Sequence, residues 1–303
     1  MKRDFKYLSD LGADGMLAVL DRADQLKTLR RKGEASPRPL AGKSVALIFE
    51  KPSTRTRVSF EVGVFELGGH PVVLSSRDTQ MGRGEPIEDT ARVLGRYVHA
   101  IVIRTFEDAK LVALAKASPV PVINALTDGA HPCQILADLQ TVRERKGTLR
   151  GLRYAWVGDG NNVANSWIEA ASILGLELTL ACPEGYDPTQ LLTAHSSAGA
   201  KISLVRDARE AVRRADVVVT DVWASMGQEA EQLKRAEAFR AYCVNPALMA
   251  EANSSALVLH CLPAHRGEEI DGVYLSQEDS PIWDEAENRL HSQKAVLEYL
   301  VRA

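Results

Sequence analysis

The densest group of residues that could do chemistry is FEKPSTRTR at 49–57. An apolar run ends at Pro52, and hydroxyl and guanidinium side chains then alternate where a helix is expected to begin, at Ser53, Thr54, Arg55, Thr56 and Arg57. The N–H groups of a helix N-terminus carry partial positive charge, and hydroxyls with a guanidinium complete a cradle for a phosphate. Because no GxxxxGK precedes these residues, a small phosphate ester is expected rather than a nucleoside triphosphate. The alternative is an ordinary Ser53 N-cap followed by solvated arginines.

A second polar cluster, HPCQILADLQT at 131–141, opens another predicted helix. Pro132 suits the first helical turn, and His131 and Gln134 lie on the side where the chain enters it. Histidine can donate to a carbonyl oxygen, and the Gln134 amide offers both a donor and an acceptor, which suits a ligand with an amide end. The alternative for His131 is a simple helix cap.

A third cluster, HCLPAHRGEEI at 260–270, follows an apolar run, which places Cys261 at the carboxyl end of a predicted buried strand. Ligands of α/β folds bind at that end. Because Pro263 takes the chain out of the sheet, the backbone carbonyls near Cys261 and Leu262 could accept hydrogen bonds from an NH₂ group. A buried, inert thiol is the alternative.

In DVWASMG at 221–227, Asp221 ends another predicted strand, and its carboxylate could hold an ammonium group. Ser225, Met226 and Gly227 are expected to form a flexible turn. An equally supported alternative is a simple strand-ending turn with Trp223 packed in the core. The segment that follows, QEAEQLKRAEAFR, is predicted to be a solvated helix.

The segment VGDGNNVANSW at 157–167 superficially resembles a dinucleotide fingerprint. It matches GxG but not GxGxxG, because no glycine stands at the third position to allow close helix packing. No acidic partner for a ribose can be assigned, so an NAD site is not predicted. The asparagine pair could instead bind the polar head of an amino acid.

These groups need elements that bring strand ends together, and the chain is patterned accordingly. Short β-branched runs alternate with helical patterns, at residues 44–50, 99–105, 153–159, 177–183, 216–222 and 256–261. This alternation is typical of parallel sheets with crossover helices, so an α/β fold is predicted. Apolar residues three or four positions apart predict two buried helix faces, one at Val58, Val62 and Phe65 and one at Ile135, Leu139 and Val142.

The length of 303 residues and the hydrophobic content of 45% predict two domains of about 150 residues each. Each domain is expected to be a parallel sheet flanked by helices, with a cleft between the domains. The predicted boundaries are residues 1–132 and 133–284. A C-terminal helix at about 285–303 is expected to return to the first domain.

Charge and composition limit the possible partners. With 37 basic and 40 acidic residues, the chain has no global positive field that would attract nucleic acid or an anionic membrane. The start MKRDFKYLSD lacks the apolar core of a signal peptide, and no stretch of about 20 apolar residues could span a membrane. Four cysteines without a CxxC pair argue against a zinc ribbon and a disulfide framework. We therefore expect a cytoplasmic chain without nucleic-acid or membrane partners.

Four of these motifs together resemble the ornithine carbamoyltransferase family. In chain order they are STRTR after a strand, HPCQ at a helix start, DVWASMG, and HCLP after a late strand. The first two motifs are shared with the wider carbamoyltransferase superfamily, and the last two point to ornithine. The resemblance covers most of the chain. It implies transfer of the carbamoyl group from carbamoyl phosphate to the side-chain amine of L-ornithine, giving L-citrulline and phosphate. It also implies a place in arginine metabolism, with biosynthesis as the expected direction. The implied reaction needs no cofactor and no metal.

The resemblance implies roles for individual residues as well. Residues expected to bind carbamoyl phosphate are Ser53, Thr54, Arg55, Thr56, Gln80, Arg104, His131, Gln134, Cys261, Leu262 and Arg289. Residues expected to bind ornithine, in the second domain, are Asn162, Asp221, Ser225 and Met226. The residues expected to act in the reaction are Arg104, His131, Asp221 and Cys261. Because the loop with Gln80 reaches into a neighbouring subunit's site in this family, the resemblance implies a homotrimer or a multiple of trimers.

Related activities differ at the same motifs. An aspartate carbamoyltransferase typically has HPLP where this chain has Cys261, and enzymes for acylated ornithine usually have a larger residue at the position of Thr54. With putrescine as the acceptor, the ammonium-holding role of Asp221 would be unnecessary. A non-catalytic binding homologue should lack some of these residues, and every mapped position is filled.

Overall fold

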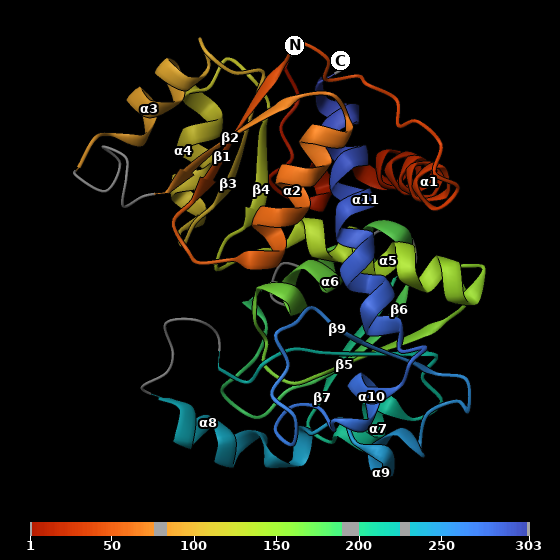
Figure 1. The fold of residues 1–303 in the computed structure, drawn as a ribbon. Helices are drawn as coiled ribbons and strands as arrows, with labels where there is room; N and C mark the ends of the chain where they lie inside the picture. The colour runs from red at the N-terminus through yellow and green to blue at the C-terminus, as the bar shows by residue number, and fades with distance from the viewer. Residues whose placement is uncertain (1, 76–83, 190–199, 225–230, 302–303) are drawn as a thin grey trace. The chain divides into compact units, whose positions relative to one another are not determined.

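The computed structural model describes residues 2–75, 84–189, 200–224 and 231–301 (Figure 1). They form two compact units, one from residues 1–140 with 287–303 and the other from residues 141–286. The chain leaves the first unit within α5 (Pro132–Lys146) and returns to it within α11 (Pro281–Val301). The predicted α/β fold, with two parallel sheets and a C-terminal helix in the first unit, is confirmed. The predicted domain boundaries, between residues 132 and 133 and between residues 284 and 285, stay a prediction.

The first unit is organised around a four-stranded parallel sheet in the order β2-β1-β3-β4. Its strands are β1 (Ser44–Phe49), β2 (His70–Ser75), β3 (Ala100–Arg104) and β4 (Val122–Leu126). Strands β1 and β3 are apolar nearly throughout, as expected of parallel strands covered on both faces. Their carboxyl ends lie side by side, with Phe49 paired to Arg104. Strand order reverses between β1 and β3, and α/β sheets bind ligands at such a point.

The helices of the first unit cover this sheet and each other. They are η1 (Leu8–Asp10), α1 (Gly12–Arg31), α2 (Thr54–Glu66), α3 (Ile87–Leu94), α4 (Asp108–Ala117), and the parts of α5 and α11 that belong to the unit. The close approach of α11 to α2 depends on Gly63, since a Cβ there would lie 3.2 Å from the Lys294 side chain. Lys294 in turn pairs with Glu66 of α2 at 2.6 Å. α11 is thereby fixed against α2.

The prediction of which face of α2 is buried is wrong. Val58 is 49% exposed and Phe65 is 73% exposed, whereas the buried side of the helix carries Phe60 and Val64. The period of 3.6 residues identifies an apolar stripe, but it cannot tell which stripe the sheet and α11 will cover. On α5 the predicted residues are fully buried: Ile135, Leu139 and Val142.

The second unit contains a five-stranded parallel sheet in the order β7-β6-β5-β8-β9. Its strands are β5 (Arg153–Val157), β6 (Glu177–Ala181), β7 (Lys201–Val205), β8 (Val217–Thr220) and β9 (Leu257–His260). Its helices are α6 (Asn162–Leu174), α7 (Ala208–Val212), α8 (Gln232–Phe239), η7 (Arg240–Tyr242), α9 (Pro246–Met249) and α10 (Val273–Ser276). Strand order reverses between β5 and β8, so the loops after these strands are expected to carry a second ligand site.

The helix after DVWASMG is present as α8, but the prediction that it is solvated is wrong for two of its residues. Phe239 is fully buried and Arg235 is 7% exposed. Phe239 packs against Trp223 and Tyr186, with ring centroids 6.0 Å and 4.8 Å away. Trp223 is therefore a core residue, and one side of α8 belongs to the core of the second unit.

Two expectations from composition concern thiols and membranes. All four cysteines are free thiols, as expected without a disulfide framework. Among the helices in the described ranges, none is long and apolar enough to cross a membrane.

Candidate active site

The N-terminus of α2 follows the carboxyl end of β1, as the STRTR motif predicts. Ser53 has an extended backbone and caps the helix, because its Oγ accepts a hydrogen bond from the Thr56 N–H at 3.3 Å. Thr54 and Arg55 are exposed on the first turn. N–H groups of a first turn point out of the helix end and carry partial positive charge. This helix end is therefore suited to an anion.

A polar cluster surrounds the buried hydroxyl of Thr56. Its Oγ1 accepts hydrogen bonds from Arg104 Nη1 at 3.5 Å and from Arg289 Nη2 at 3.0 Å. Arg104 ends β3 and Arg289 comes from α11, so two guanidinium groups from distant parts of the sequence converge beside α2. Planar guanidinium groups bind phosphate oxygens well, and this arrangement fits a phosphate ester.

Gln134 and His131 join the same cluster from the start of α5. Arg289 donates to Gln134 Oε1, and Gln134 Nε2 donates to Asp138 Oδ1 at 2.8 Å, which fixes the orientation of the amide. Burial, and then the charges of Arg289 and Arg104, hold the pKa of His131 well below its ordinary value. His131 is therefore neutral at physiological pH, and a neutral imidazole can donate to a carbonyl oxygen without adding charge.

Lys51 is a cation of the first unit that the sequence analysis missed, although it lies within FEKPSTRTR. Its side chain is only 5% exposed, pairs with Asp128 and lies 4.3 Å from the centroid of the Phe106 ring. These contacts join the loops that follow β1, β3 and β4. A lysine inside a phosphate-binding motif is the signal that could have identified it.

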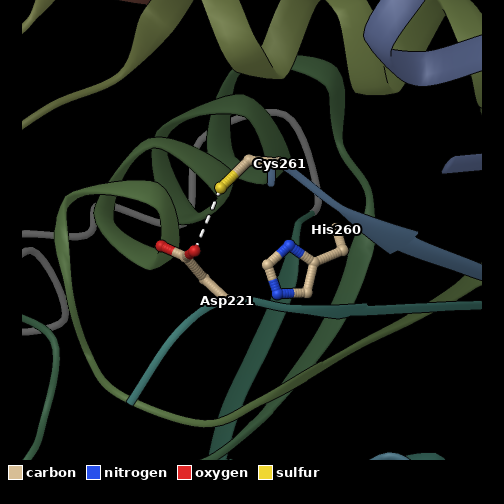
Figure 2. A group of neighbouring side chains, drawn as sticks. All are labelled: Asp221, His260 and Cys261. Carbon is tan, nitrogen blue, oxygen red and sulfur yellow. Dashed lines mark hydrogen bonds between the residues drawn. The ribbon is translucent and has the colours of Figure 1, made fainter. Parts of the chain in front are cut away.

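Figure 2 shows Asp221, His260 and Cys261 together at the carboxyl edge of the second sheet. Asp221 follows β8 and Cys261 follows β9, which are neighbouring strands. The Cys261 thiol donates to Asp221 Oδ1 at 3.0 Å, and Asn161 Nδ2 donates to Asp221 Oδ2 at 2.7 Å. These bonds hold the buried carboxylate in one orientation. An oriented carboxylate of this kind can bind an ammonium group.

Asp221, His260 and Cys261 could each direct one atom toward a metal ion, since these atoms lie within 4.8 Å of one another. The His260 ring does not suit that role. Leu262 N–H donates to Nδ1 at 2.9 Å, so the ring proton is on Nε2, which faces Glu269 Oε1 at 3.0 Å. With one nitrogen accepting and the other donating, the ring has no lone pair left for a metal.

The loop after β5 is shaped by Asn161 and Gly160. Asn161 caps α6 by accepting from the N–H groups of the first turn. Gly160 is required because a Cβ there would lie 2.5 Å from the carbonyl oxygen of Tyr186. Asn162 is the first residue of α6 and is half-buried.

In the loop after β9, Leu262 directly follows Cys261. Leu262 is also half-buried, and its backbone has a positive φ of 58°.

The structure thus brings most of the predicted residues into two groups, one in each unit. The first-unit group lies around the start of α2: Ser53, Thr54, Arg55, Thr56, Arg104, His131, Gln134 and Arg289. The second-unit residues follow strands β5, β8 and β9: Asn162, Asp221, Cys261 and Leu262. Gln80, Ser225 and Met226 lie outside the described residues, so their roles stay predictions.

Known families and relatives match the whole chain. The carbamoyl-P binding domain of aspartate/ornithine carbamoyltransferase matches residues 3–144, and its Asp/Orn binding domain matches residues 150–300. The ornithine carbamoyltransferase of Geobacter metallireducens is 55% identical over 100% of both chains. That of Syntrophus aciditrophicus is 53% identical over 99% of this chain and 100% of the relative. The chain belongs to the ornithine carbamoyltransferase family.

Solved structures of ornithine carbamoyltransferases have the same fold. The protein from Pyrococcus furiosus has a TM-score of 0.95 at 47% identity, covering 100% of this chain and 98% of that chain. The anabolic ornithine carbamoyltransferase from Campylobacter jejuni has a TM-score of 0.90 at 40% identity, covering 99% of both chains. Arg104 and Thr56 lie in the residues that match the carbamoyl-P binding domain, whereas Arg289 and Asp221 lie in the residues that match the Asp/Orn binding domain.

Proposed function

We propose that this chain transfers the carbamoyl group of carbamoyl phosphate to the side-chain amine of L-ornithine, forming L-citrulline and phosphate. The observation that carries the proposal is the convergence of Arg104 and Arg289 on Thr56 beside the N-terminus of α2. This arrangement fits the phosphate of one substrate. Membership of the ornithine carbamoyltransferase family supports the other substrate. Because an amine is itself a nucleophile and phosphate can leave directly, the reaction requires no cofactor and no metal.

Carbamoyl phosphate would bind through both ends of the molecule. The helix N-terminus, hydroxyls and guanidinium groups would hold the phosphate, through Ser53, Thr54, Arg55, Thr56 and Arg289. Arg104 and His131 would donate to the carbamoyl oxygen, and the Gln134 amide would pair with the carbamoyl NH₂. Gln80, Cys261 and Leu262 complete the proposed set, with Gln80 coming from a neighbouring subunit.

Ornithine would bind through Asn162, Asp221, Ser225 and Met226. Its δ-amine has an ordinary pKa near that of lysine, about 10.4, so the amine is mostly protonated at neutral pH and must lose a proton before attack. Asp221, held by Cys261 and Asn161, is the carboxylate that would hold an ammonium group of ornithine, and together with Cys261 it would favour the free form of the δ-amine. Backbone carbonyls at Cys261 and Leu262 would accept from the NH₂ groups where the two substrates meet.

The deprotonated amine would then attack the carbamoyl carbon, and the C–O bond to phosphate would break. Negative charge develops on the carbamoyl oxygen, where Arg104, His131 and Thr56 are suitable donors. A preorganised donor of this kind contributes roughly 3 kcal/mol to lowering the barrier. The departing phosphate keeps the bonding electron pair at the N-terminus of α2 and can take up the proton that the amine loses.

The direct test is citrulline formation by the purified protein with carbamoyl phosphate and, in parallel, ornithine, aspartate, N-acetylornithine or putrescine, without added metal or nucleotide. We expect turnover with ornithine alone. Carbamoylation of another amine would leave the phosphate site intact but contradict the roles of Asp221 and Cys261. Absence of any product would favour a non-catalytic binding protein.

We also propose a homotrimer or a multiple of trimers as the assembly. The exposed apolar stripe of α2, with Val58 and Phe65, is a surface that a second copy of the chain could cover. Phe65→Glu should therefore shift the sedimentation of the protein toward smaller species. Val112→Glu, at another exposed apolar position, is the matched control and should not. A wild-type protein that sediments as a monomer would contradict this assembly.

We also propose a role in arginine metabolism, in the direction of biosynthesis. Citrulline formation would serve arginine biosynthesis in the cytoplasm. The Campylobacter jejuni structure that this chain resembles is described as anabolic, which supports this direction. Loss of the gene should then cause an arginine requirement that citrulline relieves and ornithine does not.

A further inference from the structure

A buried ion pair in the second unit has no part in the chemistry described above. Arg235 of α8 and Asp159 of the loop after β5 lie with Nη1 and Oδ2 3.0 Å apart. Their side chains are only 8% and 9% exposed. Lys, Arg, Asp and Glu are rarely buried unless paired, and burying such a pair requires removing both charges from water. The position of the pair therefore calls for an explanation.

Arg235 contacts three of the loops at the carboxyl edge of the second sheet. Besides Asp159, its Nη1 donates to the carbonyl oxygen of Trp223 at 2.8 Å, in the segment that follows β8. Its guanidinium lies 4.9 Å from the centroid of the Tyr186 ring, in the loop after β6. A backbone hydrogen bond also joins the loop after β5 to the loop after β6, since Gly160 N–H donates to the Tyr186 carbonyl oxygen at 2.9 Å.

The same loops carry the groups that orient the acceptor carboxylate. Asp159 precedes Asn161 by two residues, and Trp223 follows Asp221 by two residues. Asn161 Nδ2 and Asp221 Oδ2 are 2.7 Å apart. A hydrogen bond of this length requires the two loops to keep their separation within a few tenths of an ångström. Arg235 bonds to both loops and is placed to set that separation.

We propose that Arg235 and Asp159 are positioning residues for recognition of the acceptor amine, a role that rests on the proposed carbamoyl transfer to ornithine. The guanidinium fixes the distance between the Asn161 loop and Asp221. Asp159 is the buried counter-charge of the guanidinium, and Glu231, which is 58% exposed, pairs with Arg235 Nε at 3.4 Å from the solvent side. No uncompensated cation therefore lies near the carboxylate that must attract an ammonium group. Neither residue touches a substrate in this account.

The alternative is that the pair only stabilises the fold. A buried ion pair is a weak source of stability compared with apolar residues of the same volume, so stability alone is a poor reason for placing one here. Arginine suits this position because its Nη1 donates to both Asp159 and Trp223 while its Nε faces Glu231 at 3.4 Å and its plane lies over the Tyr186 ring. A lysine ammonium is a single point of charge and cannot make all of these contacts at once. Burial raises the pKa of Asp159 to about 6 and the Arg235 charge opposes this rise, so the carboxylate depends on its partner to remain charged.

The test is steady-state kinetics of Arg235→Lys and Asp159→Asn with both substrates varied. We expect each variant to raise the KM for ornithine roughly tenfold, while the KM for carbamoyl phosphate changes less than about twofold. The matched control is Arg153→Gln, which removes an exposed arginine that pairs with Glu177 at the opposite end of β5. The control should leave both KM values unchanged.

The outcomes separate this inference from the proposed function. If the wild-type protein does not carbamoylate ornithine, the proposed function fails before the variants are compared. If the wild type is active and both variants keep its KM for ornithine, or raise both KM values equally, the positioning role is wrong. Should Arg235→Lys fail to fold, as judged by circular dichroism, Asp159→Asn decides the question, because it keeps the side-chain shape and an acceptor oxygen.

Discussion

The two units share one architecture and use it for opposite charges. In the first unit, the guanidinium groups of Arg104 and Arg289 meet at Thr56, at the carboxyl edge of a parallel sheet. In the second unit, the same edge of a parallel sheet carries the carboxylates of Asp159 and Asp221. The sheet decides where a ligand binds, and the side chains at the strand ends decide which ligand it is. A phosphate ester suits the first set and an amine suits the second.

The pKa values of two buried groups show the neighbouring charges of each unit. Burial lowers the pKa of His131 in the first unit, and the charges of Arg289 and Arg104 lower it further. In the second unit, burial raises the pKa of Asp159 to about 6, Arg235 opposes the rise, and Asp221 adds to it. Burial is the largest cause of both shifts, and the charged neighbours are cations in the first unit and a mixed set in the second.

The largest expected effect comes from removing a cation of the first unit. Arg104→Gln should lower kcat by roughly 10² to 10³, because a donor to the developing oxyanion is lost. Steady-state citrulline formation measures this. Arg96→Gln, at an exposed position of the same unit, is the control and should retain wild-type kcat. A reduction of less than tenfold in Arg104→Gln would contradict the assignment of Arg104 to the carbamoyl oxygen.

A smaller effect is expected from the anionic unit. Asp221→Asn should lower kcat/KM for ornithine by about a hundredfold, since the amide keeps the shape but loses the charge that attracts an ammonium group. The KM for carbamoyl phosphate should not change. Glu184→Gln, an exposed acid in the same unit, serves as the control. A rise in the KM for carbamoyl phosphate alone would overturn the division of charge between the units.

The smallest effect concerns stability in acid. Burial lowers the pKa of His291 on α11 to about 4 against an ordinary 6.5. Because the unfolded chain binds a proton between these values and the folded chain does not, this contribution to stability is complete above pH 6.5. It is lost progressively as the pH falls toward 4, and roughly 2 kcal/mol of it is lost by about pH 5. Urea unfolding of wild type and His291→Gln at several pH values measures the difference. Equal pH dependence in both proteins would contradict the assignment.

The sequence predicts much of this molecule because its signals are local. Strands β1, β3, β5, β6, β8 and β9 are apolar runs bounded by polar turns, and the motif residues follow directly after strands. The position of Asp221 after β8 and of Cys261 after β9 could be predicted for this reason. Parallel pairing then places such strand ends at one edge of a sheet.

The errors arise where tertiary packing decides. Val58 and Phe65 form an apolar stripe on α2, but which stripe is buried depends on where the sheet and α11 pack. Arg235 stands between Lys234 and Glu237 in a segment that has the composition of a solvated helix, and only the fold buries it beside Asp159. The sequence analysis does not predict three edge strands, β2, β4 and β7. Their short runs carry a weaker apolar pattern than the other strands.

The measurement that tests the division of charge most directly is calorimetric binding of phosphonoacetamide, a stable isostere of carbamoyl phosphate, in the absence of ornithine. Wild-type protein should bind it, Arg104→Gln should bind it at least about tenfold more weakly, and Asp221→Asn should bind it as the wild type does. If Asp221→Asn weakened binding as much as Arg104→Gln, the two units would not divide the substrates by charge, and the account would be wrong.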